Sequence, residues 1–252
     1  MIRSRSLLRL SLVAVATLLF HVAPASAQWS GRGELGLVLA SGNNDTKTGN
    51  AKLAVKHEGE AWTHEAGLAA VYAADDVGST AQRYEATEQS EYRFNPRNFW
   101  FGGARYENDH FSGFRHQGTV STGIGHVFID SEDTELKGQV GVGYKFFATR
   151  DVFSDTGLLL VPGESGNSLA GIANVDFKHA FNASTTLVNK LTTEYTSENT
   201  FLQNELSLQV RMTDTFAVAL GYAVRYNTDP PPTFAKTDTL FTANLVYEVK
   251  GD

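Results

Sequence analysis

Apolar and polar residues alternate in twelve stretches of about a dozen residues each, separated by turn residues, from Trp29 to the end of the chain. The pattern is clearest near the C-terminus. There one face would carry Phe216, Val218, Leu220, Tyr222, Val224 and Tyr226, and the other Ala217, Ala219, Gly221, Ala223, Arg225 and Asn227. A period of two indicates a β-strand with one apolar face. Twelve such segments predict an all-β protein whose sheet closes on itself.

The connections between these segments alternate in length. The expected strands are 29–41, 46–57, 62–74, 82–94, 98–109, 115–129, 134–149, 167–180, 185–197, 201–212, 215–227 and 237–249. Every second connection is tight and rich in turn residues: 58–61, 95–98, 130–133, 181–184 and 213–215. The others are mostly longer, at 74–81, 110–114, 150–166 and 228–236, with short exceptions at 42–45 and 198–200. Short periplasmic turns and longer outer loops are typical of outer-membrane barrels.

Alternation alone does not say which face meets water, because a soluble barrel hides its apolar face inside. Lipid contact is favoured by the many small residues on both faces, which could not fill a wide soluble barrel. Aromatic residues also stand near the strand ends of the apolar face, as in membrane girdles: Trp62, Tyr72, Tyr84, Tyr92, Trp100, Tyr106, Phe216 and Tyr226. We therefore expect a transmembrane antiparallel β-barrel of about 12 strands.

The opposite face is densely charged at mid-strand, with both signs present. Its members are Lys52, Glu65, Arg83, Glu85, Glu91, Arg93, Arg105, Glu107, Lys145, Asp176, Lys178, Lys190, Glu194, Glu205 and Arg225. Nine of them are candidate site residues: Arg83, Glu85, Glu91, Arg93, Arg105, Glu107, Lys145, Glu194 and Arg225. They could line a pore, or they could form a structural ladder of cross-strand pairs worth about 0.2–1 kcal/mol each.

Four polar residues fall on the expected lipid face, namely Glu88, Ser90, His64 and His126. A charge at the middle of the bilayer would cost on the order of 2 kcal/mol, somewhat less for Glu than for Lys or Arg. A bulge that shifts the strand register, or protonation of Glu88, would remove the conflict. The sequence leaves both explanations open.

Residues 1–27 have the form of a signal peptide. Arg3, Arg5 and Arg9 precede the short apolar run 10–20, and Ala25-Ser26-Ala27 fits a cleavage site. An N-terminal anchor is the alternative, but the run is too short to span a membrane as a helix. We expect export, removal of 1–27, and a single barrel domain over 28–252.

The charge and cysteine content narrow the function further. The leader holds three of the 21 Lys and Arg residues and none of the 28 Asp and Glu residues, so the expected mature chain has a net charge of −10. That acidity argues against nucleic-acid binding. Without any Cys, an exported chain must gain stability elsewhere, and a closed sheet without free edges can supply it.

Three segments resemble a known family. They are Gly33-Glu34-Leu35-Gly36-Leu37-Val38-Leu39-Ala40-Ser41-Gly42-Asn43-Asn44-Asp45-Thr46, then Arg105-Tyr106-Glu107-Asn108-Asp109-His110-Phe111-Ser112-Gly113-Phe114-Arg115, then Tyr226-Asn227-Thr228-Asp229-Pro230-Pro231-Pro232 with Lys236-Thr237-Asp238-Thr239. In this order and spacing they resemble the salt-induced outer-membrane protein family, also called domain of unknown function 481. The resemblance implies an outer-membrane barrel of Gram-negative bacteria with a link to salt or osmotic conditions. It supplies no catalytic residues.

The C-terminus departs from the usual barrel pattern, and two loop motifs each allow two interpretations. Many outer-membrane barrels end in an aromatic assembly signal, whereas this chain runs on through Lys250-Gly251-Asp252, which implies a weaker or internal signal. Segment 41–46 could bind a cation through its oxygens, or form a plain hairpin turn. Asp229-Pro230-Pro231-Pro232 predicts a stiff loop that closes the last hairpin, with partner binding as the alternative.

Signs of catalysis are weak. Alternation puts Ser121 and His126 on opposite faces of one strand, and neither a Gly-x-Ser-x-Gly elbow nor a His-Glu-x-x-His motif occurs. We therefore expect no enzyme, cofactor or metal. The expected partners are outer-membrane lipid, lipopolysaccharide and, during biogenesis, the barrel-assembly machinery, and the expected state is a monomer.

Two functions stay open. Eight strands leave an interior filled by side chains and sixteen or more leave an aqueous channel, so twelve lies between. The first function is a narrow, weakly selective pore for small solutes or ions. The alternative is a non-conducting structural or envelope-stress barrel whose outer loops contact lipopolysaccharide, cations or partners. An outer-membrane hydrolase is a remote third.

Overall fold

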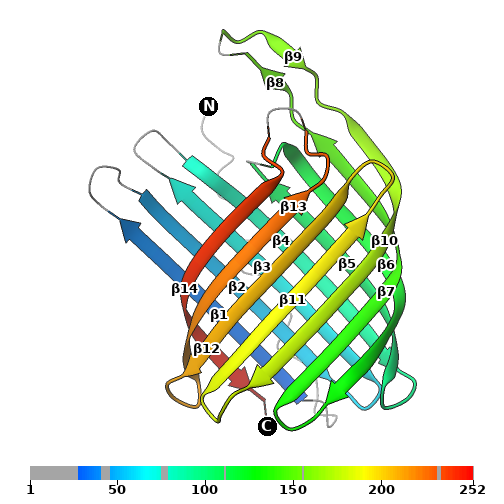
Figure 1. Cartoon of the computed structure of the whole chain (residues 1–252), viewed down its shortest axis with the longest axis vertical. Coiled ribbons are helices and arrows are strands. Elements are labelled where there is room, and N and C mark those ends of the chain that lie inside the picture. The colour runs from blue at the N-terminus through cyan, green and yellow to red at the C-terminus, as the bar shows by residue number, and fades with distance from the viewer. Residues whose placement is uncertain are drawn as a thin grey trace, which may run out of the picture.

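Twelve strands form one closed antiparallel barrel in the computed structural model (Figure 1). The structure describes residues 28–40, 46–74, 79–110, 112–154, 156–231 and 234–251. Its strands are β1 (Gln28–Ala40), β2 (Thr46–Glu58), β3 (Trp62–Ala74), β4 (Ser79–Arg93), β5 (Asn98–Asp109), β6 (Phe114–Asp130), β7 (Thr134–Thr149), β8 (Val152–Phe153), β9 (Leu159–Val161), β10 (Ser165–Ala180), β11 (Thr185–Tyr195), β12 (Thr200–Arg211), β13 (Phe216–Asn227) and β14 (Thr237–Lys250). The expected fold class and strand number are confirmed.

Each barrel strand pairs with its neighbour in sequence, and β1 closes the barrel against β14. The tight turns lie together at one end, where β14 also ends, and the longer connections lie at the other (Figure 1). We name these the turn end and the loop end. Among the described residues, no helix is long and apolar enough to cross a membrane. The expected leader 1–27 and the turn 42–45 lie outside the described residues.

The connection after β7 differs from the expected plain loop. Its residues Val152–Phe153 and Leu159–Val161 pair as a small two-stranded sheet, β8–β9, which projects beyond the loop end (Figure 1). Turn contacts close this hairpin, because Ser154 N–H donates to the Leu158 carbonyl at 2.8 Å and Leu158 N–H donates to Ser154 Oγ at 3.0 Å. Short apolar runs of two and three residues carry too little alternation to be recognised as strands.

The outer face of the barrel is apolar, as expected for a surface that meets lipid. Large side chains stand exposed along every strand, with Leu169 79% and Leu35 68% exposed. All eight expected girdle aromatics point outward. At the turn end, histidines join this belt: His57 lies 4.5 Å from the Trp29 ring and His126 lies 4.9 Å from the Phe128 ring, measured between ring centroids. An exposed apolar belt on a closed barrel fits a bilayer better than water.

Glu88 lies on this outer face in regular register, opposite Ala66 on β3 and Ala104 on β5. The bulge considered from the sequence is absent there, since the register shift between β3 and β4 falls at Ala73/Ala74. Instead, the Ser90 hydroxyl donates to the Glu88 carboxylate at 2.6 Å. The same hydroxyl lies 2.7 Å from His64 Nδ1, so the three polar side chains form one chain on the lipid face.

Replacing this outward carboxylate is expected to stabilise the barrel. Glu88→Leu should raise the free energy of unfolding in lipid vesicles by about 1–2 kcal/mol, because an acidic side chain facing the bilayer core costs about that much. Urea titration followed by Trp fluorescence measures the change. Glu60→Leu, in an exposed turn, is the matched control and should leave stability within about 0.5 kcal/mol. A loss of stability in Glu88→Leu would show that the hydrogen bond from Ser90 outweighs the cost of the outward carboxylate.

Part of the interior is filled by aromatic rings packed on glycines. Phe99 and Phe101 of β5 point inward and pack with Ala170 and Ile172 of β10. Glycines of β6 and β7 make room: a Cβ at Gly125 would lie 2.0 Å from Phe99, and one at Gly141 would lie 3.0 Å from Phe101. These rings occupy the side of the lumen near β5, β6, β7 and β10. The remaining space is lined mainly by β1–β4 and β11–β14.

Candidate functional site

The loop-end half of the lumen holds seven charged side chains from five strands, which we name the charge cluster. Its members are Glu85 (β4), Arg105, Glu107 and Asp109 (β5), Lys145 (β7), Glu194 (β11) and Arg225 (β13). Inward alternation on each strand places them in the lumen, and barrel closure brings β5 opposite β11 and β13. Residues up to 118 positions apart in sequence therefore meet.

Glu107 is the centre of the cluster, and its side chain is 0% exposed. Its carboxylate accepts hydrogen bonds from the guanidinium groups of both Arg105 and Arg225. Gln117 Nε2 donates to its second oxygen at 2.9 Å. Arg225 also reaches Asp109 at 3.1 Å. A buried carboxylate is tolerated only when its charge and lone pairs are matched in this way.

Arg105 joins the two halves of the cluster. It contacts Glu85 at 3.0 Å and Glu194 at 3.6 Å in addition to Glu107. Glu85 and Glu107 stand directly opposite each other in the β4–β5 register, so Arg105 lies between two like charges. On the other side of Arg105, Glu194 also pairs with Lys145, whose Nζ lies 3.0 Å from it. The pairs therefore run across the lumen as well as between neighbouring strands.

An aromatic ring supports the three cations. Phe201 of β12 is 1% exposed, and its ring centroid lies 4.8 Å from Arg105, 5.1 Å from Arg225 and 5.7 Å from Lys145. Cations over an aromatic face gain about 0.5–2 kcal/mol when they are desolvated. Alternation did not mark Phe201 as a site residue, although a large apolar side chain in the polar phase of a strand is a usable signal.

Loops cover the cluster at the loop end. A Cβ on Gly113, in the β5–β6 loop, would lie 2.8 Å from Pro231 and 2.7 Å from Phe234, both in the β13–β14 loop. Gly113 has φ +78, which glycine adopts without strain. Asp229 N–H donates to Asn199 Oδ1 at 3.0 Å, which ties the same loop to the β11–β12 turn. The described part of the β13–β14 loop therefore contacts the β5–β6 loop and the β11–β12 turn at the loop end.

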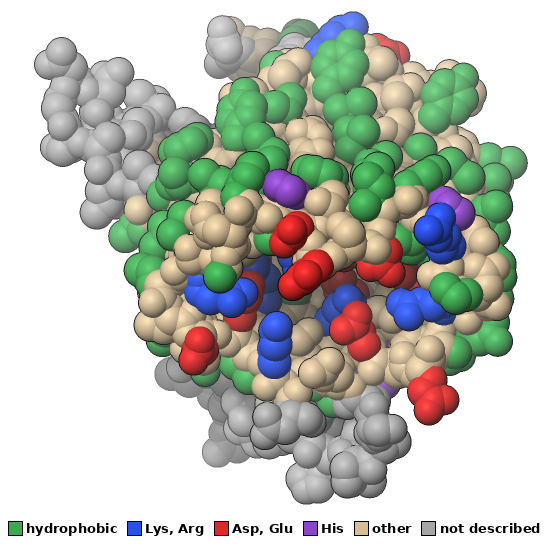
Figure 2. Space-filling model, turned by 60° about the horizontal axis from the view of Figure 1, so that its bottom comes forward, with side chains coloured by type: hydrophobic (Ala, Val, Ile, Leu, Met, Phe, Trp, Pro, Cys, Tyr) green, Lys and Arg blue, Asp and Glu red, His purple; other side chains and the backbone are tan. Residues whose placement is uncertain are grey.

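The turn-end half of the lumen is open. A cavity of about 570 Å³, which we name the turn-end cavity, extends from the turn-end mouth to Arg83, Glu85 and Arg105. Figure 2 shows the hollow at this end, with charged side chains of both signs around and inside it. No described residue of the cluster beyond Glu85 and Arg105 lines it. The inner end of the cavity thus lies against the charge cluster.

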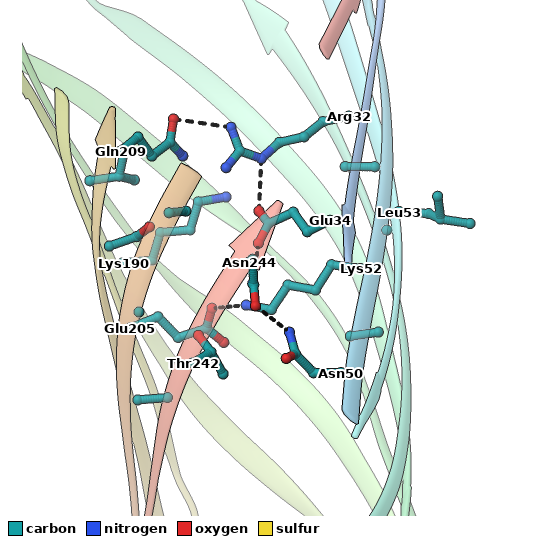
Figure 3. Close-up of a pocket in the computed structure, with 18 of the residues that line it drawn as sticks. Arg32, Glu34, Asn50, Lys52, Leu53, Lys190, Glu205, Gln209, Thr242 and Asn244 are labelled. Atoms are coloured by element: carbon teal, nitrogen blue, oxygen red, sulfur yellow. Dashed lines mark hydrogen bonds and ion pairs between the residues drawn. The ribbon is translucent and has the colours of Figure 1, made fainter. Parts of the chain in front are cut away.

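Polar pairs organise the cavity wall, as Figure 3 shows. Lys52 Nζ lies 2.7 Å from Glu205 across the lumen. Arg32 Nε donates to Glu34 at 2.8 Å, and its Nη1 reaches Gln209 at 3.2 Å. Asn50 donates to Asn244 at 3.0 Å, and Asn244 donates to Glu34 at 2.8 Å. Leu53 points away from the cavity in the same view.

The nine candidate residues separate into three groups. The structure brings Glu85, Arg105, Glu107, Lys145, Glu194 and Arg225 together in the charge cluster. Arg83 lines the inner end of the cavity. Glu91 lies in the lumen closer to the turn end, 2.8 Å from Lys137, and Arg93 is exposed at the turn end of β4. Because Arg83 stands directly opposite Asp109 in the β4–β5 register, the set is one cluster with Arg83 beside it and two separate members.

The structure places the catalytic candidates as follows. His126 points outward and lies 2.7 Å from Asn98, whereas Ser121 lies on the inward face of β6. His64 and Ser90 do meet on the outer face, a pair that the sequence did not couple. The Ser90 proton is directed to Glu88 rather than to the histidine. Among the described residues, no group of three or more His, Cys, Asp or Glu could hold a metal ion.

The chain is similar to several known proteins. Uncharacterized protein YdiY of Escherichia coli (strain K12) is 24% identical over 231 residues, which cover 90% of this chain and 86% of that protein. An outer membrane channel from Pseudomonas putida F1 superposes with a TM-score of 0.50 at 10% identity, covering 92% of this chain and 98% of that one. The translocator domain of autotransporter NalP from Neisseria meningitidis gives 0.46 at 12% identity, covering 96% and 94%.

Identity this low to the solved structures shows the fold alone. The sequence pattern of the family described as "Protein of unknown function, DUF481" matches residues 33–249. The match spans all twelve barrel strands and confirms the resemblance carried by the three motifs. The chain therefore belongs to the DUF481 family of proteins of unknown function.

Proposed function

We propose that this chain is an exported outer-membrane barrel that acts as a narrow pore for small solutes or ions. One observation carries the proposal: a cavity of about 570 Å³ lined by charged side chains enters from the turn end and stops at a layer of ion-paired side chains. In the described conformation this layer, the charge cluster, is the closed constriction. The pore conducts when the cluster rearranges.

The chemistry of the constriction supports a pore over a permanent plug. Replacing a buried ion-pair network by well-packed apolar residues is often neutral or stabilising, so charges are a poor means of sealing a barrel for stability alone. The same interior uses Phe99, Phe101 and Ile172 where it is filled by packing. Charged side chains that are hydrated when they separate give an ion a polar path that an apolar plug would deny.

The orientation belongs to the same proposal. Residues 1–27 direct export, the tight turns face the periplasm, and the loop end faces outward. The β8–β9 hairpin would then stand at the outer surface, with exposed Phe153, Leu159 and Leu160 available to lipopolysaccharide. Assembly would use the barrel-assembly machinery, and the barrel would be a monomer. The link to salt or osmotic conditions stays a prediction of the resemblance.

A non-conducting structural barrel is the second candidate, and a specific observation favours it. All four carboxylates of the charge cluster have a cation within 4.0 Å, and Glu107 is fully buried. Such complete matching could hold the lumen shut permanently. The two candidates differ in whether loosening the cluster opens a path.

Planar-bilayer recording of the purified chain separates these candidates. The wild type should give rare steps of low conductance. The double variant Glu107→Ala/Arg225→Ala removes a pair from the constriction and should raise single-channel conductance several-fold. Glu91→Ala/Lys137→Ala removes another lumen pair, separated by 2.8 Å and outside the cluster, and should conduct like the wild type.

Each outcome decides between the candidates. A single-channel conductance that increases only in the Glu107/Arg225 variant supports a pore closed by the cluster. Absence of conductance steps in the wild type and in both variants would overturn the pore and leave the structural barrel. All three proteins must first be shown to be folded, by a change in gel mobility on boiling. Large wild-type steps that no variant changes would show that the cluster is not the constriction.

A further inference from the structure

We infer that the turn-end cavity binds a small multivalent anion bearing carboxylate or phosphate groups. The inference rests on the proposed pore in that it names the class of solute that enters. Binding, however, needs only the cavity and not conduction. Its basis is the charge balance of the residues that line the cavity.

Cations outnumber carboxylates in the lining. The cations are Arg32, Lys52, Arg83, Arg105, Lys178, Lys190, Arg211 and Lys250, and the carboxylates are Glu34, Glu65, Glu85, Glu205 and Glu248. Eight against five is a surplus of three positive charges in the lining, although the whole chain is acidic. The surplus is concentrated at the mouth, because Arg105 at the inner end also pairs with Glu107 and Glu194, which lie outside the lining. A concave site lined by one sign of surplus charge concentrates ions of the opposite sign.

Every lining carboxylate is already matched within the protein. Arg32 pairs with both Glu34 and Glu248. Lys52 lies 2.7 Å from Glu205, and Lys190 lies 3.7 Å from Glu65. Arg105 lies 3.0 Å from the remaining one, Glu85. The negative charges of the wall are therefore neutralised by four of its cations.

The other four cations have no carboxylate of the described chain within 4.0 Å. They are Arg83 at the inner end, whose charge is offset because it stands directly opposite Asp109 in the β4–β5 register, and Lys178, Arg211 and Lys250 near the mouth. The last three stand within two residues of the ends of β10, β12 and β14, where these strands reach the turn end. Because the barrel order is β14-β13-β12-β11-β10, they line one continuous wall.

Acidic residues near this wall do not cancel its charge inside the cavity. Glu135 stands opposite Lys178 in the β7–β10 register, yet it neither lines the cavity nor lies within 4.0 Å of the lysine nitrogen. Asp176 lies 4.0 Å from Lys137, outside the lining. The surplus at the mouth is therefore directed into the cavity.

Size and neutral lining define the ligand further. A volume of about 570 Å³ lies in the ordinary range for small-molecule sites. Thr186, Gln203 and Gln209 add hydroxyl and amide groups to the wall between the cations. Several cations along one wall favour a ligand with two or more anionic groups, since each charge-assisted hydrogen bond adds separately. Phosphate and carboxylate satisfy this chemistry equally.

Calorimetric titration of the full chain in a non-ionic detergent tests the site, with citrate and inorganic phosphate as probes and sucrose as the neutral comparison. Citrate should bind, more weakly as NaCl is raised, because salt screens the attraction. The triple variant Lys178→Gln/Arg211→Gln/Lys250→Gln should lose at least ten-fold in citrate affinity. Phosphate binding as tight as citrate binding would identify a single-anion site and overturn the multivalent ligand.

The control variant removes the same charge at the other end of the barrel. Lys47→Gln/Arg115→Gln/Lys236→Gln alters three exposed cations at the loop end and should leave citrate affinity unchanged. Equal affinities in the two triple variants, or no citrate binding by the folded wild type, would overturn the inference. Citrate binding without conductance in any variant would end the pore and leave this site. Conductance without citrate binding would overturn the anion site and leave the pore.

Discussion

Replacing Arg105 by methionine is expected to lower the free energy of unfolding of the barrel by about 3–5 kcal/mol, the usual cost of removing one partner from a buried ion pair. Arg105 is the cation that Glu85, Glu107 and Glu194 share. Without it, four cluster carboxylates face two cations. Glu85 would lose its cation and stand directly opposite buried Glu107 with no positive charge between them. Like charges directly opposite in a sheet are destabilising.

Urea titration in lipid vesicles, followed by Trp fluorescence, measures this loss. Arg115→Met is the matched control, because Arg115 is exposed at the loop end of β6 and its truncation should cost less than about 0.5 kcal/mol. Arg105→Lys should fall between the two variants, since an ammonium keeps the charge but cannot present the planar fork to several carboxylates. If Arg105→Met is as stable as Arg115→Met, the cluster is hydrated and contributes nothing to the fold.

The barrel itself was readable from the sequence because its determinants are local. Period-two alternation sets the inward and outward faces of each strand, and turn residues mark the strand ends. The expected bounds agree with the structure to within three residues for every barrel strand, as for β4, which begins at Ser79 rather than at 82. Only the short β8 and β9 pairing lacked a periodic signal.

The charge cluster could be predicted as a set of inward residues but not as an arrangement. Alternation puts Glu107 and Arg225 in the lumen without saying that they meet. Their contact depends on barrel closure and on how neighbouring strands are staggered, which are properties of all twelve strands together. The sequence allowed ion pairs across the lumen and favoured ladders between neighbouring strands, but only the structure shows which residues pair across the lumen.

The aromatic residues inside the lumen could not be assigned from alternation, for a different reason. Phe99-Trp100-Phe101 is a continuous aromatic run, so its phase does not separate inside from outside. Its inward rings are possible because Gly123, Gly125 and Gly141 stand where they pack. Neither segment is informative alone, since the fit appears only when β5, β6 and β7 are placed side by side.

Gly141→Ala is expected to destabilise the barrel by about 3 kcal/mol, the upper part of the usual range for overpacking. The added Cβ would lie 2.3 Å from the Thr122 carbonyl oxygen on β6. That neighbour is backbone rather than a side-chain tip, so relief requires moving one strand against the other. Gly123 faces Gly141 directly in the register, and its own Cβ would lie 2.2 Å from the Val140 carbonyl oxygen. The close approach is thus shared by both strands.

Gly31→Ala provides the control, because nothing lies within 4 Å of the Cβ that it would add. This variant should be neutral or gain about 0.5–1 kcal/mol, since alanine loses less backbone entropy than glycine on folding. Urea titration in vesicles compares the two variants. If the glycines of β6 and β7 served only flexibility, both variants would behave alike. A selective loss in Gly141→Ala instead means that β6 and β7 need bare backbone at this point, where the inward ring of Phe101 packs on Gly141.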